Sequence, residues 1–408
     1  MSDSPAVSVV IPTYNRRDEL RQTLETLTMQ EFPVQEFEVI VADDGSSDDS
    51  AEVAASFDGP LRMKYVFQEN LGYRAGAARN AGARLATAPI LAFLDCGTLA
   101  GPGFVSGHLA AHSTPGRQAV IGYCFGYNAF RQDTWMPDSL STANLAEVVR
   151  LNADEPLFRD IRHAEFERVG FDLTKFAIPW SYFYTMNCSV RAAEFWAVGG
   201  FDETFRSWGI EDTELGYRLY RNGVAIALSR DAWSVELPGE RPLKRYIFSL
   251  MRNARIFLGK FPEPFVEVFA DALFSVELTT VEAESMRLAR WIEQARGLDA
   301  SAEIESAVRD LPAGASVAVF GCGGSVPASL PPATLLDFDA DLLARATANG
   351  RHTGYHSIGL RTELAPGSAD TVIVTSRLRG LWPKYGERIV TEAHRVGRQV
   401  LVTSASGG

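Results

Sequence analysis

The fold is decided by the stretch Ile90-Leu91-Ala92-Phe93-Leu94-Asp95-Cys96-Gly97-Thr98. Its five apolar residues follow Pro89 and predict a buried strand, and Asp95 stands where that strand ends. In open α/β sheets, ligands bind beyond the carboxyl ends of the strands. An acidic residue at this place therefore predicts metal or phosphate chemistry at this edge of a sheet.

Strand-like and helical patterns alternate before this stretch. Apolar runs at 7–11, 38–42 and 61–68 predict strands, and helical spacing begins near Leu20 and again near Ala75. This alternation predicts an α/β protein with a mostly parallel, doubly wound sheet. Polar residues follow three of the predicted strands, namely Thr13, Tyr14 and Asn15, then Asp43 and Asp44, then Asp95. Because these strand ends meet at one edge, they predict a nucleotide-type pocket, although the GxGxxG pattern of dinucleotide folds is absent.

Composition and charge narrow the classes of partner. A length of 408 residues predicts two or three domains, at roughly 100 to 200 residues per domain. The net charge of −12 argues against a nucleic-acid binder, because phosphate backbones are bound by basic surfaces. The four cysteines show no CxxC spacing, so we expect neither a zinc site nor disulfides, and a reduced, cytoplasmic compartment. We also expect no secretory signal and no transmembrane segment, which needs ~20 apolar residues.

Four motifs follow one another in the first part of the chain: VSVVIPTYNR at 7–16, VADDGSSDDS at 41–50, NLGYRAGAARNAG at 70–82 and APILAFLDCGTLAGPGF at 88–104. In this order and spacing they resemble the nucleotide-sugar-binding half of glycosyltransferase family 2, which has the GT-A fold. The resemblance implies inverting transfer of a sugar from a nucleoside-diphosphate sugar, usually with UDP as the nucleotide.

The resemblance also assigns roles to single residues. Pro12 and Tyr14 match positions around the nucleotide base. Asp44 matches the carboxylate that hydrogen-bonds the uracil, and Asp43 is its neighbour in the sequence. Arg79 matches an arginine of the donor site. Structural alternatives exist for several of them. Tyr14 could simply cover the sheet edge, the turn at Asp43 and Asp44 could start a helix with a serine cap, and Arg79 could lie on a solvated helix face.

A second block of sequence carries GGFDE at 199–203 and WGIEDTELGYRL at 208–219. Glu211 and Asp212 stand at a predicted helix start, where acidic residues are stabilising without any catalytic role. The block is similar to the acceptor-side motif of the same family and to a motif of galactosyltransferases that share the GT-A fold. This resemblance implies that Asp212 is the catalytic base for the acceptor hydroxyl, and that Trp208 and Glu211 contact sugar or acceptor hydroxyls.

A divalent cation, Mn²⁺ or Mg²⁺, is the cofactor that the resemblance implies, but its usual ligands are altered. The family usually carries Asp-x-Asp where this chain has Asp95-Cys96-Gly97, and glycine offers no ligand. Related galactosyltransferases have a metal-binding histidine near 233–238, where Glu236 is the only plausible substitute. Asp95 and Glu236, with diphosphate oxygens and water, could complete a six-coordinate site. The alternative is an enzyme that dispenses with metal and uses arginines.

The C-terminal part of the chain carries a second α/β pattern. Apolar runs at 317–320, 335–339, 369–374 and 399–403 predict strands, and Gly321-Cys322-Gly323-Gly324 predicts a glycine-rich turn after the first of them. This pattern resembles the first half of an S-adenosylmethionine-dependent methyltransferase. In that family the glycine turn meets the cofactor, and an acidic residue at the end of the second strand binds its ribose.

Two features argue against methylation by this segment. Ser325 stands where a third glycine of the pattern would fall, and we expect too little chain for the last strands of that fold. A degenerate Rossmann-like module that serves packing, partner docking or homodimer formation is therefore the favoured expectation. An active methyltransferase is the alternative, and cofactor binding without turnover lies between the two.

Together the patterns predict a cytoplasmic enzyme with a GT-A glycosyltransferase domain over 1–265, a helical linker over 266–312 and a truncated methyltransferase-like Rossmann domain over 313–408. The expected reaction moves a sugar from a nucleoside-diphosphate sugar, UDP-linked by expectation, to a nucleophile on a saccharide, natural product or peptide, with Asp212 as general base. The alternatives are a bifunctional glycosyltransferase and methyltransferase, or a non-catalytic nucleotide-sugar binder.

Overall fold

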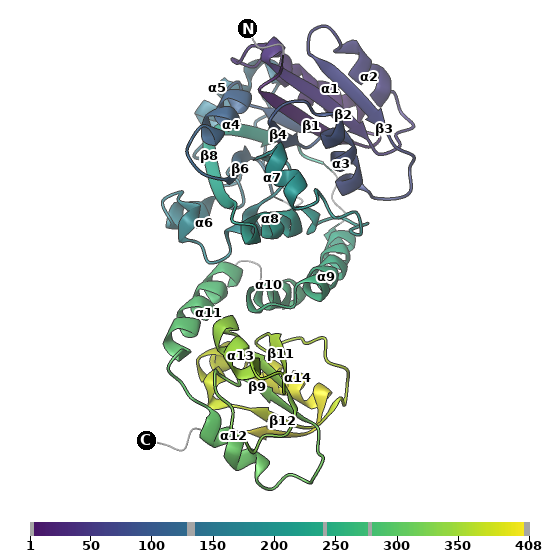
Figure 1. The fold of residues 1–408 in the computed structure, drawn as a ribbon. Helices are drawn as coiled ribbons and strands as arrows, with labels where there is room; N and C mark the ends of the chain where they lie inside the picture. Colours follow the sequence, from purple (N-terminus) through teal and green to yellow (C-terminus); the bar gives the residue numbers. More distant parts are fainter. Residues whose placement is uncertain (1–3, 129–134, 240–242, 276–279, 404–408) are drawn as a thin grey trace. The chain divides into compact units, whose positions relative to one another are not determined.

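The computed structural model describes residues 4–128, 135–239, 243–275 and 280–403. The chain divides into two compact units, Met1–Asn253 and Ala254–Gly408 (Figure 1). The three-part division expected from the sequence stays a prediction. Within the described ranges, none of the helices combines the length and the apolar character that crossing a membrane requires.

The first unit is built on one eight-stranded sheet. Its strands are β1 (Val7–Thr13), β2 (Phe37–Asp43), β3 (Met63–Phe67), β4 (Ile90–Leu94), β5 (Thr98–Ala100), β6 (Gln118–Phe125), β7 (Asn187–Arg191) and β8 (Ala225–Glu236). Its helices are α1 (Arg17–Thr28), α2 (Ser50–Ser56), α3 (Ala75–Leu85), α4 (Phe104–His112), α5 (Leu145–Asn152), α6 (His163–Arg168), α7 (Ala192–Ala197) and α8 (Glu211–Arg221), followed by α9 (Leu243–Lys260), which continues past the end of the unit.

Strand order determines which strand ends meet. The order along the sheet is β3-β2-β1-β4-β7-β6-β8-β5, and the first four strands of this order run parallel. Thr13 pairs with Asp43 and Val10 with Phe93, so the carboxyl ends of β1, β2 and β4 lie at one edge. The predicted α/β class and the parallel half of the sheet are confirmed. The sheet as a whole is mixed, because β7 runs antiparallel to β4 and β6, and β5 antiparallel to β8.

Helices cover both faces of the parallel half of this sheet. Val9 and Val39 belong to one core cluster with Leu24 of α1. Val10 points to the opposite face, where a Cβ on Gly82 of α3 would come within 2.6 Å of its Cγ1. Because side chains alternate between the two faces of a strand, α1 and α3 lie on opposite faces. The close approach of α3 depends on the missing side chain of Gly82.

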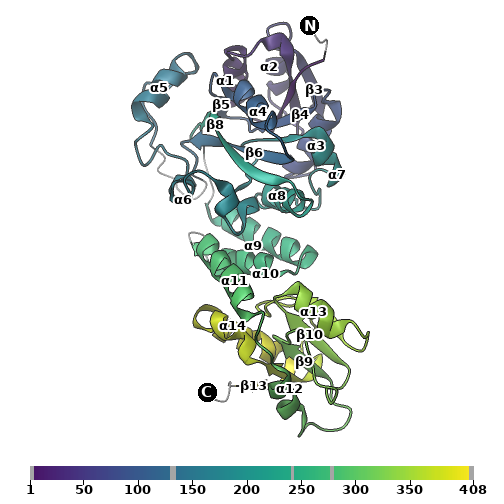
Figure 2. The ribbon, with the colours of Figure 1, turned by 60° about the vertical axis from the view of Figure 1, so that its left-hand side comes forward.

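The second unit holds a five-stranded parallel sheet in the order β11-β10-β9-β12-β13. Its strands are β9 (Val317–Phe320), β10 (Ala333–Asp337), β11 (Thr353–His356), β12 (Ala369–Val374) and β13 (Gly397–Val402). Its helices include α10 (Pro264–Ser275), α11 (Val281–Ala295), α12 (Ser301–Val308), α13 (Ala340–Thr347) and α14 (Trp382–Val396), and Figure 2 shows α13 beside β10. The predicted small Rossmann-like α/β domain is confirmed.

One strand and one packing relation of this unit differ from the sequence expectation. Strand β11 was not predicted, because its four residues are largely exposed and form no apolar run. Helices α10 and α11, which lie in the predicted linker, contribute Val268 and Leu288 to the same core cluster as Phe320 and Ile358. The linker helices therefore pack into the core of the second sheet.

Candidate active site

Asp43 shapes the turn at the end of β2. Its carboxylate accepts hydrogen bonds from the backbone N–H groups of Gly45 (3.0 Å) and Ser46 (2.7 Å) and from the Tyr65 hydroxyl (2.7 Å). Both oxygens are thus engaged within the protein. The serine-capped helix start that was the structural alternative is not formed, because α2 begins at Ser50 and its N-cap residue Asp49 makes no side-chain cap hydrogen bond.

Asp44 connects β2 to the segment that precedes α3. Its carboxylate accepts hydrogen bonds from Gln68 Nε2 (2.6 Å) and from the backbone N–H of Arg74 (2.9 Å). Burial raises the pKa of Asp44, and these two bonds act in the opposite direction. Because Arg74 immediately precedes α3, Asp44 helps to fix the start of the helix that carries Arg79.

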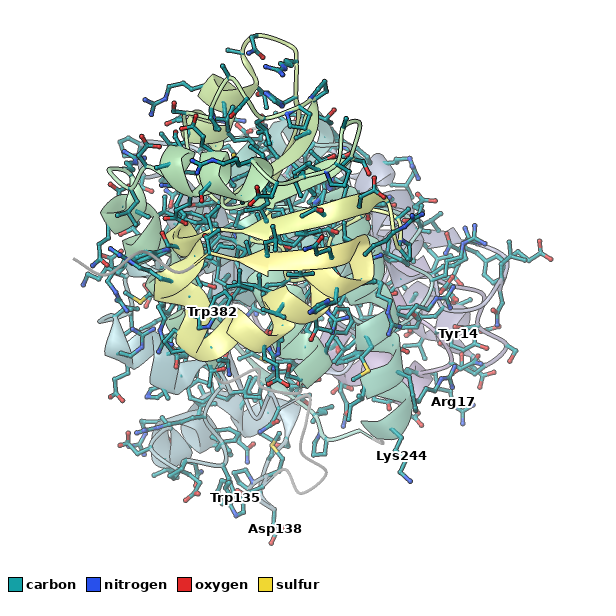
Figure 3. The ribbon with its side chains drawn as sticks, turned by 90° about the horizontal axis from the view of Figure 1, so that it is seen from below. Tyr14, Arg17, Trp135, Asp138, Lys244 and Trp382 are labelled. Atoms are coloured by element: carbon teal, nitrogen blue, oxygen red, sulfur yellow. The ribbon has the colours of Figure 1, made fainter. Side chains whose placement is uncertain are left out.

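Tyr14 and Pro12 lie at the end of β1. Pro12 pairs with Ala42 in the sheet, and Tyr14 follows the strand with 46% of its surface exposed. The Tyr14 hydroxyl accepts a hydrogen bond from Asn70 Nδ2 (2.7 Å), and Figure 3 shows the residue near the outer edge of the first unit. An exposed ring that is anchored through its hydroxyl leaves a face on which a planar group can stack.

Arg79 of α3 brings distant parts of the predicted site together. Its side chain is 4% exposed, its Nη2 donates to Asp95 Oδ1 at 2.7 Å, and its Nη1 donates to Glu211 Oε1 at 3.4 Å. The guanidinium also lies 5.4 Å from the ring centre of Phe201. A buried guanidinium with two carboxylate partners is unlike the solvated helix residue that was the alternative for Arg79.

Glu211 and Asp212 begin α8 beside this arginine. The preceding residue, Ile210, has φ +76, and Asp212 Oδ1 accepts a hydrogen bond from the backbone N–H of Thr213 (2.7 Å). Burial raises the pKa of both carboxyl groups, and the negative charge of Asp212 raises that of Glu211 further. Asp95 and Glu211 pair with the guanidinium of Arg79, and Asp212 interacts with it electrostatically, so three acidic groups share one positive charge.

The second oxygen of Glu211 has no hydrogen-bond partner among the described residues, although the residue is only 5% exposed. Buried polar atoms in folded proteins almost always have a partner, and an unpaired carboxylate oxygen lowers stability. Acidic residues at a helix start usually gain from the helix dipole without such a cost. A ligand hydroxyl that donates to Glu211 Oε2 would remove the cost, which makes this oxygen a candidate binding atom.

Two tyrosines beside the cluster were not among the site residues expected from the sequence. Tyr73 is 37% exposed in the segment before α3, and burial of its hydroxyl, followed by the charge of Glu211, raises its pKa well above the ordinary value. Tyr184 lies under the guanidinium of Arg162, 5.0 Å from its ring centre, and burial raises its pKa to about 12 with a contribution from Asp212. Tyr73 stands inside the motif at 70–82 and Tyr184 outside the motifs, and no periodicity indicated where their hydroxyls point.

Trp208 lies in the loop before α8, where α9 holds it. Its ring stacks on Tyr246 with 4.2 Å between ring centres and 12° between planes. Asn253 Nδ2 donates to the backbone carbonyls of Ser207 (2.8 Å) and Gly209 (2.6 Å). The loop is therefore fixed in place, while contact of Trp208 with a sugar stays a prediction.

The residues suggested for a divalent cation do not form a gathered ligand set. Asp95 is paired with Arg79, and at Gly97, which has φ +92, Arg16 Nη2 lies 3.0 Å from where a Cβ would be. Glu236 is the last residue of β8. Across the described part of the chain, His, Cys, Asp and Glu side chains form no group of three that could hold a metal ion. Metal binding by Asp95 and Glu236 stays a prediction.

Asp337 and Arg377 pack against the glycine-rich turn of the second unit. Asp337, the last residue of β10, is fully buried and is held by Arg377 through Nε (2.8 Å to Oδ2) and Nη2 (3.1 Å to Oδ1). The backbone N–H of Gly323 donates to Asp337 Oδ2 at 2.7 Å. A Cβ on Gly323 would lie 3.4 Å from Arg377 Cδ. The acid that would bind a ribose thus has both oxygens bonded within the protein.

A second buried carboxylate, that of Glu267, lies at the same edge of that sheet. Glu267 of α10 is 1% exposed and accepts hydrogen bonds from Ser357 Oγ (3.0 Å) and from the backbone N–H groups of Ile358 (2.6 Å) and Leu360 (3.1 Å). Burial raises its pKa to about 7, and these bonds act to lower it. Because β11 ends at His356, this loop lies at the carboxyl edge where α/β sheets bind ligands. This geometry gives the bifunctional alternative no support.

Sequence comparisons match the part of the chain that forms the cluster. Residues 8–180 match Glycosyl transferase family 2, and residues 167–235 match the N-terminal domain of galactosyltransferase. The first match includes Arg79 and Asp95, and the second includes Glu211 and Asp212.

Two relatives extend over the whole chain. Validoxylamine A glucosyltransferase of Streptomyces hygroscopicus subsp. limoneus is 43% identical over 416 residues, which cover 100% of this chain and 92% of the relative. The enzyme of the same name from Streptomyces hygroscopicus subsp. jinggangensis (strain 5008) is 42% identical, with coverage of 100% and 99%. Among solved structures, S. aureus TarS 1-349 in complex with UDP-GlcNAc aligns with 62% of this chain and 66% of its own at 19% identity and a TM-score of 0.45. The similarity to the two glucosyltransferases includes the second unit.

Proposed function

This chain belongs to glycosyltransferase family 2 and is a glycosyltransferase, and from this premise we propose that it moves glucose from UDP-glucose, with inversion, to a hydroxyl of a small natural product. The names of the two relatives that span the chain support the sugar and the acceptor class. The four N-terminal motifs support UDP as the nucleotide. The observation that carries the proposal is the cluster in which the buried Arg79 joins Asp95 to the Glu211 and Asp212 pair.

Asp212 is the proposed base. Burial raises its pKa, and a carboxylate with a raised pKa is a better proton acceptor. As the acceptor oxygen attacks the anomeric carbon, its proton passes to Asp212. The bond between that carbon and the diphosphate oxygen breaks on the opposite face, and the nucleoside diphosphate leaves with the bonding electrons. A single displacement of this kind inverts the anomeric centre.

Glu211 and Arg79 are the proposed positioning groups. Glu211 Oε2 would accept a hydrogen bond from a sugar or acceptor hydroxyl, which supplies its missing partner. Arg79 fixes the other oxygen of Glu211 and one oxygen of Asp95. Since its charge is shared between these two acids, Arg79 is poorly placed to neutralise a diphosphate as well.

The rate of transfer is expected to fall on the acid side with an apparent pKa above the ordinary carboxyl range. A base must be unprotonated, and the raised pKa of Asp212 moves its protonation to higher pH. In Asp95→Asn a negative charge that raises the pKa of Asp212 is gone, so the acid limb should move to lower pH. The measurement is kcat/KM from about pH 5 to about pH 9 in both proteins. An acid limb at the same pH in Asp95→Asn would contradict the electrostatic contribution of Asp95 to the pKa of Asp212.

The direct test is a donor and acceptor panel with the full-length protein. UDP-glucose, UDP-galactose, UDP-GlcNAc and GDP-mannose are offered with validoxylamine A and with simple saccharides as acceptors. We expect one glucosyl group to be transferred from UDP-glucose, with the anomeric configuration opposite to that of the donor by NMR. Retained configuration would refute the single displacement. Binding of UDP without turnover of any donor would favour the non-catalytic binder.

A further inference from the structure

The carboxyl edge of the first sheet needs positive charge for the proposed donor. A nucleoside-diphosphate sugar brings two phosphates, and the developing charge on the leaving diphosphate must be stabilised as the sugar departs. Arg79 is already engaged by Asp95 at 2.7 Å and by Glu211 at 3.4 Å, and it also interacts electrostatically with Asp212. A further cation at this edge is therefore needed.

Arg16 lies across the end of β4, at the carboxyl edge of the first sheet. Its Nη1 donates to the backbone carbonyl of Cys96 at 2.9 Å, and its Nε and Nη2 lie 3.3 Å from Glu19 Oε1. Its Nη2 is 3.0 Å from the place of a Cβ on Gly97 and 3.7 Å from that of a Cβ on Gly239. The guanidinium thus fills the space that a side chain at position 97 would occupy.

The guanidinium of Arg16 is both held and accessible. Its side chain is 39% exposed, and the bonds to Glu19 and Cys96 fix its orientation. A guanidinium carries five N–H groups, so these bonds leave N–H groups for a further acceptor. Arginine binds phosphate oxygens through two parallel hydrogen bonds, which a point-charge ammonium cannot reproduce.

We propose that Arg16 binds the diphosphate of the donor and supplies, without a metal ion, the positive charge that stabilises the leaving nucleoside diphosphate. The inference rests on the proposed function for the identity of the donor. Gly97 removes a second carboxylate from this edge, and Arg16 occupies its place. Arg16 gives no proton to the leaving group, because the diphosphate leaves as an anion and Arg16 stays charged throughout.

The test separates recognition of phosphate from recognition of the base. Calorimetry measures the affinity of UDP and of uridine for the wild-type protein, Arg16→Ala and Arg16→Lys, each with a chelator and then with Mn²⁺. We expect wild-type UDP affinity to be unchanged by the chelator. Arg16→Ala should bind UDP about 10-fold to 100-fold more weakly, since hydrogen bonds to charged groups are lost, and should bind uridine as the wild type does. Arg16→Lys should recover part of the loss.

Arg17→Ala is the matched control. Arg17, which Figure 3 labels, is the neighbouring arginine. Its side chain is 49% exposed and pairs with Asp49 at 2.6 Å. Its removal should leave UDP affinity unchanged. Turnover of UDP-glucose in the presence of the chelator should fall about 100-fold to 1,000-fold in Arg16→Ala, the usual effect of removing one donor to a developing anion.

Two outcomes would overturn the assignment of Arg16 and leave the transferase activity standing. The first is wild-type UDP binding that requires Mn²⁺. The second is an equal loss of UDP and uridine affinity in both Arg16 variants, which would mark a structural role. A protein that binds UDP through Arg16 and turns over no donor would instead refute the proposed function alone.

Discussion

Asp212→Asn is expected to lower kcat for sugar transfer by about 100-fold to 10,000-fold while the affinity for UDP stays the same. Asparagine keeps the shape of the side chain and can still accept a hydrogen bond from Thr213, but it cannot take a proton. The loss should therefore fall on the chemical step. Single-turnover transfer and UDP calorimetry, measured on the same preparation, distinguish the two quantities.

Asp231→Asn provides the control for this substitution. It makes the same chemical change at an exposed residue of β8, and its kcat should match that of the wild type. If Asp212→Asn kept its turnover, another group would have to be the base. If UDP affinity fell together with kcat, Asp212 would serve the donor site and not proton transfer.

Arg377→Met is expected to lower the free energy of unfolding of the second unit by about 3 to 5 kcal/mol. Methionine roughly preserves the length of the side chain but leaves Asp337, which is fully buried, without its charged partner. The contacts of Arg377 with the backbone carbonyls of Ala295 and Leu298 are lost as well. Native-state hydrogen exchange of the amides in β9 and β12 measures the unit by itself, so unfolding of the first unit does not interfere.

Arg398→Met tests a surface ion pair in the same unit. Arg398 lies 3.6 Å from Asp370, and the two side chains are 76% and 46% exposed, so its removal should cost about 1 kcal/mol or less. The double variant Asp337→Leu with Arg377→Met removes both buried charges and should recover part of the stability. An effect of Arg377→Met as small as that of Arg398→Met would show that the buried pair does not stabilise the sheet edge.

The parallel half of the first sheet and the edge that carries the candidate site were predictable from the sequence, whereas β5, β7 and β8 were not predicted. Strand β4 is an apolar run that ends in Asp95, and β2 is one that ends in Asp43. Such patterns are local, because burial of a strand requires consecutive apolar residues and its end requires a polar or turn residue. The second sheet was predictable for the same reason, except for β11, whose exposed residues carry no such pattern.

The contacts at this candidate site were decided only by the tertiary structure. Arg79 reaches Glu211 across 132 positions of the chain, and Arg16 reaches Cys96 across 80. In the second unit, Arg377 reaches back 40 positions to Asp337 and closes an edge that resembled a cofactor site. Periodicity tells which face of an element is buried, but not which distant side chain packs against it, because that depends on how the elements pack together. The sequence by itself therefore determined which sheet edge carries the candidate site, and the packing of distant segments decided which charges meet there.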